Sequence, residues 1–257
     1  MAYKTIQVKT EGRVGVITFS RPEALNALCD ELTTELATVL AAFEKDGGIG
    51  CVVLTGSKKA FAAGADIKEL QARDFVGLYM HDPFAETWEA VARFRKPIIA
   101  AMTGSLMAGG MMLSLNSDLR FGLRGARVGI TEVKIGRGSP WAAPALTMLP
   151  QPILMEIVLT GDLMPIERLH EYGFTNYLED TPDAVRARAC ELAKRVASGA
   201  PLSVIAAKAS VRATMDLGCE AGLEEGKRLH EVVYASQDAI EGPRAFAEKR
   251  APVWQGR

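Results

Sequence analysis

Hydrophobic and polar positions near the start of the chain follow the two-residue period of β-strands. Residues 6–8 and 14–19 alternate in this way, and a Glu-Gly turn signal lies between them, so we predict two paired strands. The pattern then changes, because residues 30–43 place leucines at every fourth position. That spacing puts the leucines on one face of a helix. We therefore predict a helix over 30–43, closed by the Gly-Gly pair at 47–48.

Three further strands are predicted after this helix. Residues 51–55 are apolar and β-branched, which is typical of a buried strand, and residues 98–102 and 119–122 are predicted as the next two strands. Helical patterns separate them, one over 84–94 and one opening at Gly110. Strands that alternate with helices indicate βαβ crossovers, and hence a mostly parallel sheet covered on both faces.

The pattern from Ala142 onward is almost entirely helical. The predicted helices there are 151–160, 165–171, 183–197, 201–215 and 220–236. We therefore expect an α/β core over residues 1–195 and a helical C-terminal region over 196–257.

One stretch of the chain first resembles a membrane span. Residues 97–117 hold 21 positions without a charge, which is close to the length needed to cross a bilayer. Glycine and serine, however, cluster in the middle of this stretch and divide it. A short strand over 97–102, a turn of small residues and a buried helix from Gly110 explain it better. We predict no membrane contact.

Charge and composition exclude other classes of protein. The 257 residues include 30 Lys and Arg against 31 Asp and Glu, so the net charge is −1. A nucleic-acid-binding protein needs a basic surplus to replace the counterions of the phosphates, so we expect no such partner. With 48% hydrophobic and 24% charged residues, the chain has the composition of an ordinary globular protein.

Cysteine and histidine positions argue against a metal site or a disulfide framework. The cysteines lie far apart, no Cys-x-x-Cys pair exists, and the three histidines are scattered. These residues are Cys29, Cys51, Cys190, Cys219, His81, His170 and His230. The N-terminus also has no signal-peptide pattern. We expect reduced thiols, mostly in the core, and a cytoplasmic or similarly reducing location.

Two loops share a design that points to chemistry. Residues 60–68 and 103–110 each follow a predicted strand, contain small side chains and lead into a helix. The first N–H groups of a helix have no partner within it. Two such loops on neighbouring parallel strands would aim N–H donors at one point, to hold a carbonyl oxygen that gains charge or a phosphate. Neither nucleotide-binding fingerprint is present, and tight packing turns are the simpler alternative.

These loops belong to a set of motifs that resembles a known family. Residues 21–28, 60–70, 96–101 and 238–254 are similar, in this order, to the enoyl-CoA hydratase/isomerase (crotonase) superfamily. The last segment resembles the carnitinyl-CoA dehydratase branch. The resemblance implies an α/β fold with a crotonase-like (ClpP/crotonase) ββα spiral core. It also implies a helical C-terminal part that forms a homotrimer or a hexamer.

The resemblance also implies a substrate and its binding residues. The backbone N–H groups of Ala65 and Gly109 would hold the thioester oxygen of an acyl-CoA, which makes an enolate reachable. Coenzyme A would enter as part of this substrate, with no permanently bound cofactor. The implied coenzyme A-binding residues are Ala24, Leu25, Lys59, Ala62, Gly64, Asp66, Ile67, Lys68, Phe246 and Lys249.

One of the two glutamates that hydratases of this family commonly use is missing. Its position, three residues after Gly109, holds Met112, which carries no titratable proton. The other glutamate corresponds to Glu132. An apolar pocket should raise the pKa of this carboxyl and suit it to proton transfer near neutrality. The alternative is a surface acid in the first turn of a helix.

A second departure from the family follows Glu132. Residues 136–143 replace a Pro-Gly-x-Gly-Gly run, and Trp141 and Arg137 there would reshape the acyl end of the pocket. Arg137 would pair with an acyl carboxylate or simply face the solvent. His81 falls near the expected lid of the pocket, where a solvated loop histidine is the simpler interpretation.

The motifs together predict an enzyme in which one glutamate moves a proton beside a stabilised thioester. The missing glutamate favours an isomerase, whereas the C-terminal segment favours a hydratase or dehydratase. A thioester hydrolase or decarboxylase of the same fold is the alternative within enzymes. A catalytically weak acyl-CoA-binding protein is the alternative outside them.

Overall fold

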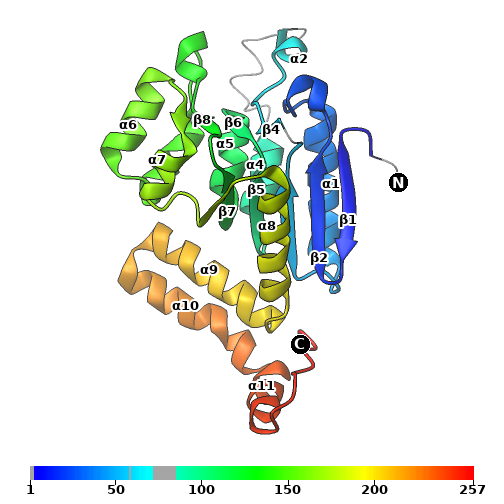
Figure 1. Ribbon diagram of the computed structural model, residues 1–257. Coiled ribbons are helices and arrows are strands. Elements are labelled where there is room, and N and C mark those ends of the chain that lie inside the picture. The colour runs from blue at the N-terminus through cyan, green and yellow to red at the C-terminus, as the bar shows by residue number, and fades with distance from the viewer. Residues whose placement is uncertain (1–2, 58, 72–84) are drawn as a thin grey trace.

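Six strands form the larger of two sheets in the computed structural model, which describes residues 3–57, 59–71 and 85–257 (Figure 1). Only the first two strands pair antiparallel, and the others run parallel, as the sequence predicts. In spatial order the strands are β1 (Ile6–Glu11), β2 (Val14–Phe19), β3 (Cys51–Thr55), β5 (Ile98–Met102), β7 (Leu119–Leu123) and β10 (Tyr177–Glu179).

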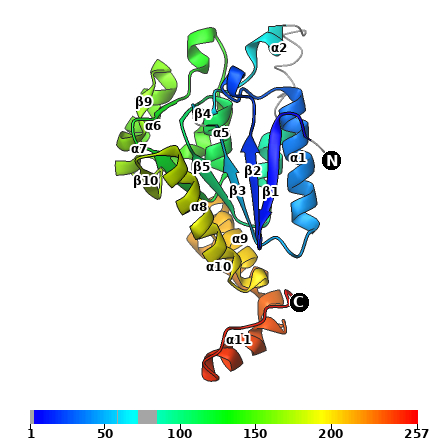
Figure 2. The same ribbon diagram turned by 45° about the vertical axis from the view of Figure 1, so that its right-hand side comes forward.

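Helices cover both faces of this sheet, which is why its central strands are apolar throughout. Every residue of β3 and β5 is buried. Alternate side chains enter different cores: Leu54 packs with α1 (Asp30–Lys45), and Val53 packs with α8 (Pro182–Ala197). Figure 2 shows α1 and α8 on opposite sides of the strands. Burial on both faces removes the need for polar positions in these strands.

A second, smaller sheet includes parts of both predicted loops. Its strands are β4 (Ala60–Ala62), β6 (Ser105–Met107), β8 (Arg127–Gly129) and β9 (Met164–Pro165). The first three each follow a strand of the larger sheet, so the chain repeats one strand–strand step three times. The prediction of plain loops over 60–68 and 103–110 is therefore wrong in part. Two or three residues are too short to display a strand period.

Most of the remaining helices agree with the predicted segments to within a few residues at their ends, whereas the helix Asp238–Ala247 had no predicted counterpart. The remaining helices are α2 (Ile67–Gln71), α4 (Ala85–Ala92), α5 (Gly109–Asn116), α6 (Gln151–Thr160), α7 (Ile166–Glu171), α9 (Pro201–Leu217), α10 (Cys219–Tyr234) and α11 (Asp238–Ala247). Three 3₁₀ helices add η1 (Pro22–Ala24), η2 (Glu132–Ile135) and η3 (Pro140–Thr147). The uncharged stretch forms β5, β6 and α5, and no described helix is long and apolar enough to span a membrane.

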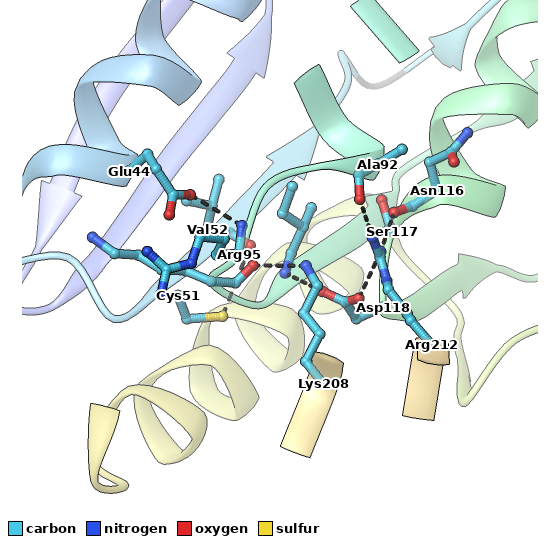
Figure 3. Close-up of polar contacts among 12 residues, drawn as sticks. Glu44, Cys51, Val52, Ala92, Arg95, Asn116, Ser117, Asp118, Lys208 and Arg212 are labelled. Carbon is cyan, nitrogen blue, oxygen red and sulfur yellow. Dashed lines mark hydrogen bonds and ion pairs between the residues drawn. The ribbon is translucent and has the colours of Figure 1, made fainter. Parts of the chain in front are cut away.

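A shielded ionic cluster fastens α9 to the α/β core (Figure 3). The carboxylate of Asp118 lies 2.7 Å from Lys208 Nζ and 3.0 Å from Arg212 Nη2. Lys208 also donates to the carbonyl of Lys96, and Arg212 to that of Asn116. The predicted boundary between residues 195 and 196 falls just before the end of α8, at Ala197. Asp118 lies before this boundary, and Lys208 and Arg212 lie after it, so the cluster joins the two predicted regions.

The cysteines lie largely as the sequence suggests. Cys29, Cys51 and Cys190 are buried, and Cys219 is exposed at the start of α10. Burial raises the pKa of the Cys51 thiol to about 12, so this side chain is a small apolar group at neutral pH.

Candidate active site

A cavity of about 360 Å³ lies where the two small-residue loops meet the segment that follows β8. It contains the three predicted catalytic residues, Ala65, Gly109 and Glu132. Its described lining is Ala63, Ala65, Ile67, Ala108, Gly109, Met112, Thr131, Glu132, Ile135, Arg137, Gly138, Pro140 and Trp141. Most of these side chains are small or apolar, so a polar group inside the cavity would be poorly solvated.

Ala65 in the first loop lines this cavity. Ala65 forms an isolated parallel bridge with Leu28, in which the neighbouring residues Gly64 and Asp66 make the hydrogen bonds. Within the described part of the chain, the Ala65 N–H itself makes no backbone hydrogen bond. Gly64 has a φ of +97°, a conformation that favours glycine and turns the chain into the cavity.

Gly109 in the second loop lines the same cavity. Gly109 is the first residue of α5, and no backbone acceptor for its N–H lies among the described residues. Ala108 precedes it with a φ of +48°, a strained conformation for a non-glycine residue, of a kind that often marks functional sites. The loops touch, since a Cβ on Gly109 would lie 3.6 Å from the Gly64 Cα.

Two polar side chains from residues 21–26 hold the first loop in position, and the sequence analysis gave neither a role. Arg21 Nη2 lies 2.8 Å from Asp66 Oδ2, and Arg21 Nη1 donates to the carbonyl of Ala27. The buried amide of Asn26 donates to the carbonyl of Ala60 at 2.9 Å. Both residues belong to a family-like motif, which could have marked them as functional. Their partners could not be predicted, because they lie about 35 to 45 residues away in the chain.

Glu132 places a carboxyl group in the wall of the cavity. It is the first residue of η2, and only 8% of its surface is exposed. The interpretation of Glu132 as a surface acid is therefore wrong. Its Oε2 atom has no hydrogen-bond partner among the described residues. Burial raises the pKa of this carboxyl, while the nearby charge of Arg137 and the side chain of Trp141 act in the opposite direction.

The two departures from the family pattern lie in the same cavity. Met112 projects from the first turn of α5 and is almost fully buried, so an apolar thioether stands where a second carboxyl was expected. Trp141 from η3 and the half-buried Arg137 line another part of the wall. The interpretation of Arg137 as a purely solvent-facing residue is therefore wrong.

The expected coenzyme A-binding residues lie in two places, one group near the cavity and the other at the C-terminal end of the chain. Ala62 and Gly64 are buried beside the cavity, Ala24 and Asp66 are half-buried, and Leu25, Ile67, Lys59 and Lys68 are exposed. Phe246 and Lys249 are exposed as well, but α11 lies at the opposite end of the molecule from α2 and β4 (Figure 1). A single chain therefore does not bring α11 to the cavity. His81 lies outside the described residues.

Comparisons with known proteins agree with this geometry. The family model described as enoyl-CoA hydratase/isomerase matches residues 9–257. A probable enoyl-CoA hydratase of Rhizobium meliloti is 38% identical over 259 residues, which cover all of both chains. The mitochondrial enoyl-CoA hydratase of Pongo abelii is 36% identical over 92% of this chain and 82% of its own.

Solved structures give the same result at the level of the fold. The enoyl-CoA hydratase of Bacillus anthracis superposes with a TM-score of 0.93 at 28% identity, over 99% of this chain and 100% of its own. An enoyl-CoA hydratase subunit of Geobacillus kaustophilus gives 0.90 at 32% identity, over 99% of both chains. The chain therefore belongs to the enoyl-CoA hydratase/isomerase family, the enzymes of the crotonase superfamily.

Proposed function

We propose that this enzyme stabilises the enolate of an acyl-CoA thioester and uses Glu132 as its single acid/base group. One observation carries the proposal. Ala65, Gly109 and Glu132 line the same cavity, and among the described residues the N–H groups of the first two have no backbone acceptor and Oε2 of the third has no hydrogen-bond partner.

The two N–H groups would hold the thioester oxygen. Loss of a proton from the carbon chain of a conjugated thioester moves negative charge onto this oxygen. Fixed donors aimed at such a charge in a water-poor site lower the barrier by about 3 kcal/mol each. Because the donors are backbone groups on packed loops, they need no rearrangement when the charge forms.

Glu132 would carry the proton. An ionised carboxylate removes a proton from the substrate, and the neutral acid returns one to another carbon. A raised pKa brings the two forms closer in population near neutral pH, which is the condition that favours this exchange.

A double-bond shift is the reaction that the site supports best. It needs one group that removes a proton and returns it on the same face of the substrate. Hydration must both activate a water and protonate a carbon, and Met112 supplies neither function. Hydration is nevertheless the second candidate, because the similar proteins named above are called hydratases.

The deciding experiment incubates the enzyme with a panel of enoyl-CoA thioesters and weighs the products by mass spectrometry. A gain of one water identifies hydration, an unchanged mass with a new retention time identifies isomerisation, and release of free coenzyme A identifies hydrolysis. Binding without turnover across the panel would support an acyl-CoA-binding protein and contradict the proposal.

The variant Glu132→Gln tests whether Glu132 carries the proton. We expect kcat to fall at least about 100-fold, as for loss of a general acid/base, while binding of a saturated acyl-CoA is retained. Glu191→Gln is the matched control, because Glu191 is an exposed acid on α8. Unchanged rates in Glu132→Gln would remove Glu132 from the mechanism.

The assembly completes the proposal. Because α11 lies far from the cavity of its own chain, Phe246 and Lys249 would reach coenzyme A only in a neighbouring copy, within a homotrimer or hexamer. We also propose a cytoplasmic location, which suits the four free thiols.

A further inference from the structure

We propose that Arg137 selects substrates whose acyl group ends in a carboxylate, so that the enzyme acts on the coenzyme A monothioesters of short unsaturated diacids. This inference rests on the proposed function and specifies its substrate class. Its basis is the charge and shape of the cavity that contains Glu132.

Arg137 is built into the cavity wall. It follows Gly136, which closes η2 with a φ of +70° and turns the chain back. The backbone N–H of Arg137 then donates to the carbonyl of Glu132 at 3.0 Å. Its side chain is half-buried and lines the same cavity as the catalytic candidate. The local fold therefore directs this arginine inward.

The cavity offers little else that could recognise a charge. Among its described lining residues, Glu132 and Arg137 are the only charged side chains, and Thr131 is the only other one that is strongly polar. The remaining lining is small or apolar apart from the indole N–H of Trp141. An acyl carboxylate entering this space would therefore meet a single cation.

Glu132 does not exhaust the capacity of this cation. A guanidinium carries five N–H donors in a planar fork that matches a carboxylate. Glu132 and Arg137 line the same cavity, and the charge of Arg137 lowers the pKa of Glu132, yet Glu132 Oε2 receives no hydrogen bond from any described residue. The buried Nε atom of Arg137 itself has no hydrogen-bond partner among the described residues. This donor is therefore available to a second carboxylate whatever the rest of the guanidinium contacts.

The size and dryness of the cavity give this contact its discriminating power. A volume of about 360 Å³ shared with the thioester suits a short acyl group. Apolar surroundings strengthen the attraction between opposite charges. A neutral alkyl end would instead cover part of the arginine without offering it an acceptor, which opposes binding.

The test compares three substrates of the same chain length in steady-state kinetics. They are trans-2-hexenoyl-CoA, the six-carbon trans-2-enoyl thioester that ends in a carboxylate, and the methyl ester of that carboxylate. We expect the wild type to prefer the carboxylate over the methyl ester in kcat/KM by roughly 10- to 100-fold, the range for a hydrogen bond between charged groups.

In Arg137→Met this ratio should fall to near one, and Arg137→Lys should keep part of the preference. Arg124→Met should keep the wild-type ratio, because Arg124 is an exposed arginine that pairs with the exposed Asp180. A wild type without preference would overturn the proposal. An equal loss on all three substrates in Arg137→Met would also overturn it, because Arg137 would then act only through Glu132.

Failure of the proposed function would give a different result, namely no turnover of any of the three thioesters. The selection is then measured by calorimetry, with the saturated carboxylate thioester and its methyl ester as ligands. A preference for the carboxylate that Arg137→Met abolishes would support the selection without catalysis. Equal affinities would overturn it.

Discussion

Opposing effects act on the pKa of the Glu132 carboxyl. Burial disfavours its charged form and raises its pKa above the ordinary 4.5, whereas Arg137 and Trp141 favour the charge. Burial dominates. An acid whose pKa is higher in the folded state than in the unfolded chain binds its proton more tightly when folded. Ionising it therefore lowers the stability of the protein.

This linkage predicts how the stability of Glu132→Gln depends on pH. Below pH 4.5 the carboxyl is protonated in both states, so its ionisation costs no stability. As the pH rises from 4.5 through the raised pKa, the wild type should lose stability relative to Glu132→Gln, and the difference should then level off. Urea unfolding of both proteins at several pH values measures this. A difference that is constant with pH would contradict the assigned shift.

The contact between the two loops at Gly109 leads to a second prediction at the scale of residues. A Cβ on Gly109 would lie 2.6 Å from Leu28 Cδ1, so Gly109→Ala must displace the loop or the leucine. We expect kcat to fall at least about tenfold, because the Gly109 N–H would move away from the position proposed for the thioester oxygen. The stability should fall by about 1–3 kcal/mol through overpacking.

Gly47→Ala is the matched control, since nothing lies within 4 Å of its Cβ. Kinetics and urea unfolding of both variants provide the measurement. A Gly109→Ala enzyme with full kcat would show that its N–H does not bind the reacting oxygen.

At the scale of elements, Asp118 connects β5, β7 and α9. Its carboxylate accepts a hydrogen bond from the Ile98 N–H at 2.8 Å and pairs with Lys208 and Arg212 (Figure 3). The side chains of Asp118 and Lys208 are 19% and 9% exposed, so water screens this pair poorly. Burial lowers the pKa of Lys208, and Asp118 acts against that shift.

Asp118→Asn should therefore destabilise the fold by about 3–5 kcal/mol, because Lys208 would remain buried without its counter-charge. Adding Lys208→Met should recover part of this loss, since the unpaired charge is then gone. Asp162→Asn is the control: its pair with Lys134 is more than half exposed on both sides and contributes less than about 1 kcal/mol. Similar losses for Asp118→Asn and Asp162→Asn in urea unfolding would refute this role.

At the scale of the whole molecule, the C-terminal helices carry apolar side chains that one chain leaves uncovered. Phe246 is 87% exposed, and Tyr234, Ile240 and Val232 are each more than half exposed. Exposed apolar surface of this kind marks contact sites between proteins. It fits the proposed assembly, in which α11 of one copy lies beside the cavity of another.

Phe246→Ala tests that assembly. We expect KM for acyl-CoA substrates to rise severalfold with little change in the stability of the isolated chain, because Phe246 makes few contacts within its own chain. Light scattering should give a mass three or six times that of the chain for the wild type. A wild-type monomer with unchanged KM in the variant would contradict both the assembly and the role of Phe246.

The sequence by itself determined the long elements, the parallel sheet and the family. Strands β3 and β5 are recognisable as short apolar runs, and helix α1 by its repeating leucines. Loops that let a ligand approach the backbone closely need small residues, which are visible in the sequence. Glu132 and Met112 were identifiable because their positions relative to a motif are local. Strands of two or three residues carry no such period, so β4, β6, β8 and β9 were missed.

Only the tertiary structure decided which groups share a site. Ala65 bridges Leu28, the N–H of Ala108 donates to the carbonyl of Gly129, and Asp118 meets Lys208 about 90 residues away. Burial of Glu132 and the inward position of Arg137 likewise depend on packing against distant segments. Burial and pairing arise from contacts between residues remote in the chain. The chemistry was therefore visible as residue types in the sequence, and as a site only after folding.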